Sequence, residues 1–290
     1  MKSKRVNSRR LTLFPFLRKY LKGWKRKRRI KMVDLKDIND ALNTYIRPQS
    51  FPVAVKMCQR KEMIPEKARF PKKDLGISIT LCQGIAMTRR YGWTIALGKE
   101  DQICPHGLVV LGFVPGKGYR DGTMAEKIGL WTREEFVRIS QGLSFLEYGR
   151  YLYILCAPIH SARFTPDFIM IYGNPAQVAR LVQGATVISG RPLSFSTTGG
   201  IGCSTYVART ILTDECQVVL AGAGDRYFAL TQDHELAFTI PMSKAETVIK
   251  GLELGHRKFG HRYPTPSWLR FQGPIPEEYR RFTDLLLAEE

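Results

Sequence analysis

The sequence predicts an α/β (α+β) fold in which a mixed β-sheet is covered by helices. Segments with helical spacing of apolar residues alternate with short apolar runs of strand length. Several of these runs are apolar at almost every position, which is typical of strands buried on both faces. The chain has 290 residues, of which 44% are hydrophobic and 24% charged, so it can bury a substantial core. We therefore expect one folded domain over residues 33–290.

The helices are expected where apolar residues recur at spacings of three and four. In residues 34–46 these are Leu35, Ile38, Leu42 and Ile46, which would form one apolar face. The expected helices are 34–46, 76–92, 132–143, 174–190, 204–212, 243–259 and 276–290.

Capping residues indicate where three of these helices begin. Thr132 precedes an acidic first turn, and Asn174 precedes Pro175 at the first helical position. Ser243 and Glu246 have the spacing of a capping box.

The strands are expected from β-rich apolar runs that are bounded by turn residues. These runs are 51–58, 93–98, 108–113, 151–158, 167–173, 216–222 and 236–241. A weak internal repeat accompanies them, because "CQGIAMTR" (82–89) resembles "CSTYVART" (203–210), with a second cysteine near a strand in each case. The sheet could therefore consist of two related halves, with chance similarity as the alternative.

The positive charge of the chain is concentrated at its N-terminus. The formal net charge is +19, and residues 1–32 contain 14 of the 45 lysines and arginines but none of the 26 acidic residues. The remaining 31 basic residues exceed the 26 acids by only 5. Binding to nucleic acid or to a membrane surface is therefore expected only through residues 1–32.

The basic leader 1–32 has two interpretations. The codons of Arg28 and Arg29 can form a purine-rich ribosome-binding sequence shortly before Met32, after which an acidic amphipathic segment begins. The leader is then untranslated sequence included by a misplaced start. Alternatively, it is a disordered basic extension. No apolar run reaches the roughly 18 residues of a membrane-spanning helix, and the leader does not resemble a secretory signal.

Four of the six cysteines are candidate metal ligands. Cys58 and Cys156 lie within apolar strand-like runs and are expected to be buried hydrophobic residues. The other four lie at helix starts, turns or strand ends, namely Cys82, Cys104, Cys203 and Cys216. Thiolates suit zinc or an iron–sulfur cluster, but the spacing matches no compact metal motif. Four unconnected cysteines, or one reactive thiol at Cys203, are the alternatives, and His106 is a further candidate ligand.

Two glycine-rich segments suggest a site for a small anion. "GGIGC" precedes a helix, where backbone N–H groups of Gly200 and Gly202 could approach an anion. "GAGDR" follows a strand and contributes Gly224, Asp225 and Arg226, of which the arginine could hold a carboxylate or phosphate. A plain turn with a surface charge pair explains the second segment equally well.

Several segments together resemble one protein family. "PVAVKM", the helical Cys82, "CPHG" (104–107), "DFIMIYGNPAQVARL" (167–181) and "CQVVLAGAGDR" (216–226) are similar in order and character to the family called domain of unknown function 169. The resemblance covers roughly residues 34–255 and excludes the leader. It implies a cytoplasmic, single-domain prokaryotic protein, often from anaerobes and without an established activity. It also implies cysteines at the positions of Cys82, Cys104, Cys203 and Cys216.

Two functions follow as hypotheses. The first is a metal- or iron–sulfur-binding protein of redox or cofactor chemistry, with these four cysteines as ligands and a redox partner. The second is a module that binds a small anionic ligand without redox chemistry, between the start of the helix at Gly202 and Arg226. Whether the chain is an enzyme is left open. Six cysteines without a secretory signal favour a cytoplasmic location.

Overall fold

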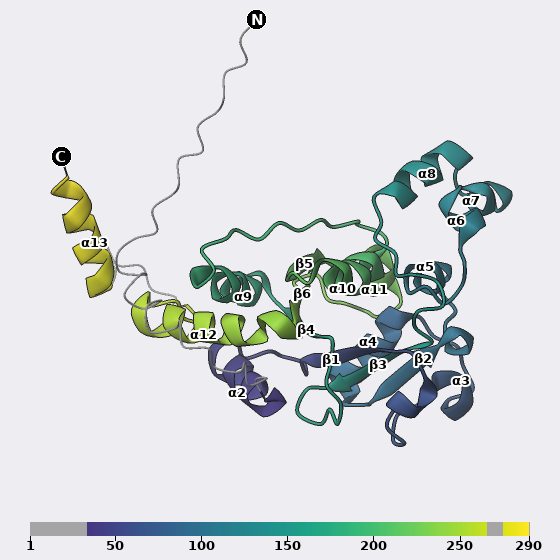
Figure 1. Cartoon of the computed structure of the whole chain (residues 1–290), viewed down its shortest axis with the longest axis horizontal. Helices are drawn as coiled ribbons and strands as arrows, with labels where there is room; N and C mark the ends of the chain where they lie inside the picture. The colour runs from purple at the N-terminus through teal and green to yellow at the C-terminus, as the bar shows by residue number, and fades with distance from the viewer. Residues whose placement is uncertain (1–33, 266–274, 290) are drawn as a thin grey trace, which may run out of the picture. The chain divides into compact units, whose positions relative to one another are not determined.

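The computed structural model describes residues 34–265 and 275–289 (Figure 1). The chain divides into the units Met1–Met32 and Val33–Glu290, and every described residue belongs to the second unit. Both interpretations of the basic leader lie outside the described residues, as does the segment 266–274 of the proline-rich tail.

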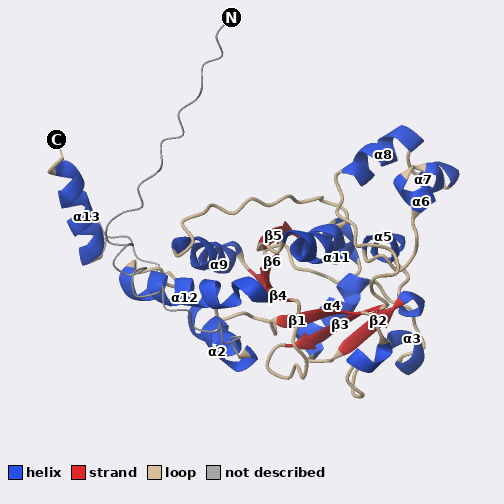
Figure 2. Cartoon of the chain, in the orientation of Figure 1, coloured by secondary structure: helices blue, strands red, loops and turns tan. Residues whose placement is uncertain are grey.

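The chain has an α/β fold built on one six-stranded sheet, whose strands are drawn as red arrows in Figure 2. The strand order is β2-β3-β1-β4-β6-β5, and each pair of neighbours is antiparallel. The strands are β1 (Val53–Cys58), β2 (Ile95–Gly98), β3 (Tyr153–Pro158), β4 (Phe168–Gly173), β5 (Gln217–Leu220) and β6 (Leu236–Pro241). The sheet is thus antiparallel, not mixed. Its strands read as continuous apolar runs because helices bury both faces, whereas antiparallel sheets commonly leave one face in water.

Helices connect and cover these strands. The longer ones are α2 (Leu35–Tyr45), α4 (Leu81–Tyr91), α8 (Arg133–Gln141), α9 (Pro175–Val187), α12 (Met242–Lys258) and α13 (Glu277–Leu287). The shorter ones are η1 (Lys61–Met63), α3 (Pro71–Asp74), η2 (Lys99–Asp101), α5 (Pro105–Val110), α6 (Lys117–Arg120), α7 (Thr123–Lys127), the π-helix η3 (Ser204–Arg209), α10 (Thr210–Thr213) and α11 (Ala223–Tyr227). Within the described ranges, no helix has the length and apolar character needed to span a bilayer.

Different helices cover the two faces of the sheet. One core contains side chains of α4, α5 and η3 and includes Phe168 and Met170 of β4. The other contains side chains of α2, α9 and α12 and includes Ile169 and Ile171 of the same strand. Successive residues of a strand point to opposite faces, so β4 contributes alternately to both cores.

The two halves of the sheet have the same topology. Outward from the centre, the first half runs β1-β3-β2 and the second β4-β6-β5, so that each half has its first strand innermost and its second strand at the edge. A helix precedes the edge strand in each half: α4 carries Cys82 at its second position, and η3 follows directly on Cys203. The second cysteines of the internal repeat do not correspond, because Cys104 follows its edge strand whereas Cys216 precedes its own.

Two local predictions are wrong. The run 108–113 is not a strand, because α5 begins at Pro105 and buries Val109 and Val110; tertiary packing outweighs the β-propensity of valine here. The capping box at Ser243 and Glu246 does not form. The α12 helix begins directly after β6, and the Ser243 hydroxyl donates a hydrogen bond to the Asp214 carboxylate 2.7 Å away.

Helices α9 and α12 pack side by side, with little space between their backbones (Figure 1). A Cβ placed on Gly251 of α12 would fall onto the carbonyl oxygen of Gly184 in α9. A Cβ on Gly184 would lie 2.7 Å from Leu252 Cγ. Both glycines are therefore required by the close approach of the two helices.

We expect Gly251→Ala to lower the free energy of unfolding by about 2–4 kcal/mol, because the added methyl group forces α9 and α12 apart. Chemical denaturation of the full chain measures this loss. The matched control is Gly142→Ala, since Gly142 has a φ of −80° and the nearest atom to its Cβ position is 3.5 Å away. An equal loss in both variants would show that the approach of the helices is not the reason.

Candidate functional site

Three of the four candidate cysteines lie on the same face of the sheet. Cys82 is in the first turn of α4, Cys104 is the N-cap of α5, and Cys203 immediately precedes η3. Cys82 and Cys203 are buried, and Cys104 is partly exposed. The local sequence explains these positions, because a capping box between Thr80 and Gln83 starts α4 just before Cys82.

Cys216 lies on the opposite face. It belongs to the core that includes Ile171, Val218 and Phe238, beneath α9 and α12. The pKa of its thiol is raised to about 12, and burial is the largest cause. Glu215 also raises it, whereas Lys244 lowers it. The sheet therefore separates Cys216 from the other three cysteines, and the four thiols do not meet in one place.

The three remaining thiols are close enough for their charges to interact. The pKa of Cys82 is raised to about 12, and burial is the largest cause. Asp225 and Cys104 also raise it, whereas the hydrogen bond with Thr80 lowers it. Burial also raises the pKa of Cys203 well above its ordinary value, together with Cys104, Asp225 and Cys82. A thiolate at any of the three positions would thus oppose ionisation of its neighbours.

The Cys82 thiol is held by contacts from two segments. Its Sγ atom is 2.9 Å from the Thr80 hydroxyl oxygen and donates to the Gly224 carbonyl oxygen at 3.5 Å. The second contact joins residues 142 positions apart and connects α4 with the start of α11. Gly224 thus takes part in the site through its backbone.

The two glycine-rich segments pack against each other. The Ala223 N–H donates to the Gly199 carbonyl oxygen at 3.1 Å. A Cβ on Gly222 would lie 3.1 Å from the Gly200 carbonyl oxygen, and one on Gly202 would lie 2.5 Å from Asp225 Oδ2. These glycines therefore permit a close approach of two backbone segments, and they do not form an open cradle for an anion.

Asp225 is the most unusual ionisable group of this region. It is 4% exposed, and its Oδ1 atom has no hydrogen-bond partner among the described residues. Burial raises the pKa of its carboxyl to about 6, although the Gly222 N–H, the Arg89 guanidinium and the Tyr206 hydroxyl lower it. A buried carboxylate with an unpartnered oxygen and a raised pKa is typical of functional sites.

Arg226 does not take part in this arrangement. Its guanidinium is about half exposed and pairs with Asp233, at the surface. The anion clamp predicted from Gly202 and Arg226 is therefore not assembled, since the arginine is engaged elsewhere and Gly202 lies against the Asp225 carboxylate.

A buried ion pair between Arg89 and Glu235 lies near Asp225. Arg89 donates from Nη1 and Nη2 to the two carboxylate oxygens of Glu235, at 2.6 and 2.9 Å. Its guanidinium also lies 4.0 Å from the centre of the Tyr172 ring. Burial raises the pKa of Glu235, but hydrogen bonds from Arg89 and the Gln232 N–H lower it, with a net decrease. Glu235 is thus ionised and fixes Arg89 near Asp225.

On the side of Cys104, sequence reasoning singled out His106 as a further candidate ligand but found neither Tyr119 nor Gln102. The His106 Nδ1 and the Tyr119 hydroxyl are 2.6 Å apart. Burial lowers the pKa of His106, and burial together with Cys203 and Cys104 raises that of Tyr119. Gln102 is buried, and neither its amide nitrogen nor its oxygen has a partner among the described residues. Only the short distance of Gln102 and His106 from Cys104 in the sequence points to them.

The π-helix η3 could not be found from the sequence either. It carries Tyr206, whose hydroxyl hydrogen-bonds to the Asp225 carboxylate. Single π-turns within helices frequently occur at functional sites. Both Tyr206 and Cys203, which directly precedes η3, interact with Asp225.

The site combines three thiols with a buried carboxylate. Among the described residues, no group of three or more His, Cys, Asp or Glu side chains is already placed around a position for a metal ion. The donor types nevertheless suit a thiophilic metal, because soft sulfur ligands prefer zinc and iron–sulfur centres. The Oδ1 atom of Asp225, from an independent segment, is an oxygen without a hydrogen-bond partner among the described residues.

Comparison with known proteins identifies one family. The sequence model of the family described as domain of unknown function 169, uncharacterised ArCR, matches residues 41–251. The segments on which the resemblance was based all lie within this range. No curated protein and no solved structure matches the chain.

We expect Asp225→Asn to stabilise the metal-free chain at neutral and alkaline pH. The folded carboxyl has a pKa of about 6 against a reference of 3.8, so the native chain loses stability as the pH rises through this interval. The loss is complete above about pH 6 and amounts to about 3 kcal/mol. The variant should therefore be more stable than the native chain by this amount at about pH 8, and by little at about pH 4.

Urea denaturation at both pH values, in the presence of a chelator, measures the difference. Asp233→Asn is the matched control, because Asp233 is exposed and its carboxylate is paired with Arg226. A native chain that is more stable than Asp225→Asn at alkaline pH would contradict the raised pKa.

Proposed function

The chain belongs to the family of domain of unknown function 169, and we propose that it binds a thiophilic metal centre, zinc or an iron–sulfur cluster, through Cys82, Cys104 and Cys203. The observation that carries the proposal is that three thiols from separate elements interact with one another, and that two of them, Cys82 and Cys203, also interact with the buried Asp225 carboxylate, whose Oδ1 has no partner among the described residues. Such a centre would supply Lewis-acid or redox chemistry.

Each ligand has a definite origin in the fold. Cys82 and Cys203 come from the helices that precede the two edge strands, and Cys104 comes from the loop after β2. Because no three donors in the part of the chain that the structure describes are already grouped around a metal position, these side chains would turn toward one another when the metal binds. Asp225 is the fourth donor, and binding would give its Oδ1 atom the partner that it lacks.

The electrostatics favour a cation at this position. Ionisation of the Cys82 and Cys203 thiols is opposed by burial and by Asp225, and ionisation of Asp225 is opposed by burial. A bound cation reverses this effect, since it stabilises thiolates and carboxylates next to it. Cys82, Cys203 and Asp225 are costly to ionise without a cation and are readily ionised with one.

The proposal includes a cytoplasmic location and a redox partner. All six cysteines are free, as expected in a reducing compartment. The alternative function, binding of a small anion without redox chemistry, has no support at Gly202 and Arg226, where the guanidinium is paired with Asp233.

Cysteine variants test the metal site. The full chain, purified without oxygen, should contain about one equivalent of zinc, or iron with inorganic sulfide, per chain. We expect Cys82→Ser, Cys104→Ser and Cys203→Ser to reduce this content by more than about tenfold. Elemental analysis with visible absorption measures the content and distinguishes zinc from a cluster.

Cys216→Ser is the matched control, because this thiol is buried on the other face of the sheet. Unchanged metal content in Cys216→Ser agrees with a three-thiol site. A native chain that contains no metal and has accessible, freely titrating thiols at Cys82, Cys104 and Cys203 would refute the proposal.

The affinity for zinc should rise with pH. The thiols of Cys82 and Cys203 have raised pKa values, so both lose a proton when the metal binds. We expect the apparent affinity to increase between about pH 6 and about pH 8 by roughly tenfold per pH unit for each thiol deprotonated. Competition with a chromophoric chelator measures the slope, and a flat profile would exclude thiolate ligands.

A further inference from the structure

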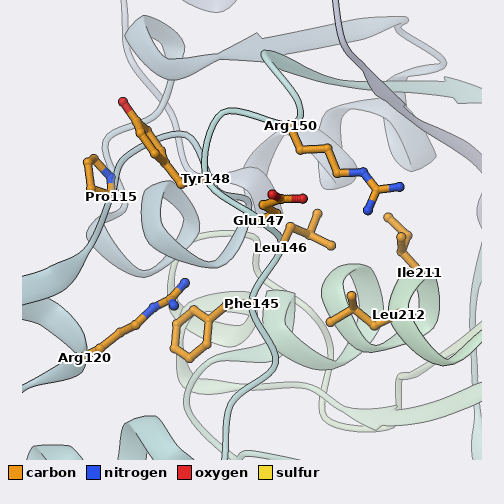
Figure 3. A pocket seen from close by; sticks show the side chains of 9 residues that line it. All are labelled: Pro115, Arg120, Phe145, Leu146, Glu147, Tyr148, Arg150, Ile211 and Leu212. Atoms are coloured by element: carbon orange, nitrogen blue, oxygen red, sulfur yellow. The ribbon is translucent and has the colours of Figure 1, made fainter.

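A pocket whose lining contains none of the residues of the thiol site carries unneutralised positive charge. It has a volume of about 520 Å³ and is lined by Pro115, Arg120, Phe145, Leu146, Glu147, Tyr148, Arg150, Ile211 and Leu212. Figure 3 shows Arg120 and Arg150 approaching it from two sides. Within the described residues, no salt bridge involves either arginine or Glu147. Two guanidinium groups and one carboxylate therefore line the pocket, which leaves a net positive charge.

The walls of this pocket are partly apolar. The Arg120 guanidinium lies 4.3 Å from the centre of the Phe145 ring. Ile211 and Leu212 close the other side (Figure 3), and the Leu212 side chain is exposed. An aromatic ring under a guanidinium and aliphatic side chains opposite form a slot for a flat apolar group.

Backbone hydrogen bonds fix the loop that supplies most of these residues. The Leu146 N–H donates to the Val110 carbonyl oxygen at 2.9 Å, and the Gly149 N–H donates to that of Gly112 at 3.0 Å. The loop is further held by Ser204 of η3, whose hydroxyl accepts from the Ser144 N–H at 2.7 Å and donates to the Ser144 carbonyl oxygen at 3.1 Å. The pocket is therefore formed before a ligand arrives, and preorganisation of this kind lowers the entropic cost of binding.

We propose that this pocket binds a small organic anion with a flat apolar body, such as an aryl carboxylate or sulfonate. The arginines receive the anionic group in charge-assisted hydrogen bonds, and the ring of Phe145 with Leu212 receives the flat body. Glu147 opposes a second negative charge and accepts from a donor on the ligand. The site is separate from Gly202 and Arg226, and it does not depend on the metal centre.

Titration of the full chain with anilinonaphthalene sulfonate tests the proposal, because this probe combines a sulfonate with an aromatic body and fluoresces in apolar pockets. We expect Arg120→Met and Arg150→Met each to weaken binding by about tenfold or more. Glu147→Gln should strengthen binding several-fold, since it removes the opposing charge. All three side chains are at the surface, so the variants should fold as the native chain does.

Three comparisons complete the experiment. Arg262→Met removes an equal charge from an exposed position outside the pocket and should leave the affinity unchanged. Benzoate should displace the probe, whereas inorganic phosphate at equal ionic strength should not, because it has no apolar body. Cys104→Ser should bind the probe normally, which separates this site from the metal site. Equal affinity in the native chain and both arginine variants, or an equal loss in Arg262→Met, would overturn the proposal.

Discussion

The close approach of two backbone segments is the constraint on which the candidate site depends. Residues 199–202 and 222–225 meet through the Ala223–Gly199 hydrogen bond and through glycines that leave no room for a Cβ. This contact brings the start of η3 with Cys203 against the start of α11 with Asp225. The Gly224 carbonyl then receives the Cys82 thiol from α4. A side chain at Gly222 or Gly202 would push the two segments apart. Cys203, which follows Gly202, would then be separated from Cys82, which is held by Gly224.

The same turn occurs in both halves of the sheet. Gly98 ends β2 and is followed three residues later by Asp101, whose Oδ2 accepts the Gly98 N–H at 2.9 Å. Gly222 follows β5 and is followed three residues later by Asp225, whose carboxylate accepts the Gly222 N–H. Together with the identical strand order and the matching positions of Cys82 and Cys203, this agreement indicates two related halves. This structural agreement supports two related halves more strongly than the sequence repeat does. The repeat pairs Cys104 with Cys216, but these two cysteines do not occupy equivalent positions in the structure.

Local patterns predicted most elements, because their causes are local. The apolar runs of β1 and β4 and the caps at Thr132 and Asn174 depend on neighbouring residues only. The side of the sheet that holds Cys216 could not be predicted in this way, because a shift of one residue exchanges the faces of a strand. Likewise, "GAGDR" indicated Asp225, but its contacts with Tyr206 and Arg89 join segments far apart in the chain.

The two equivalent aspartates differ in their hydrogen bonding. Both carboxylates are buried, and both follow an edge strand. Asp101 has a backbone donor for each oxygen, Gly98 for Oδ2 and Lys72 for Oδ1, and so completes a structural turn. Asp225 has the equivalent glycine donor, yet its Oδ1 atom has no partner among the described residues. Because an unsatisfied buried oxygen lowers stability, a turn that served structure alone would be expected to resemble the one at Asp101. The unsatisfied oxygen lies in the half where Cys82 and Cys203 approach the carboxylate, which is where a cation would complete its coordination.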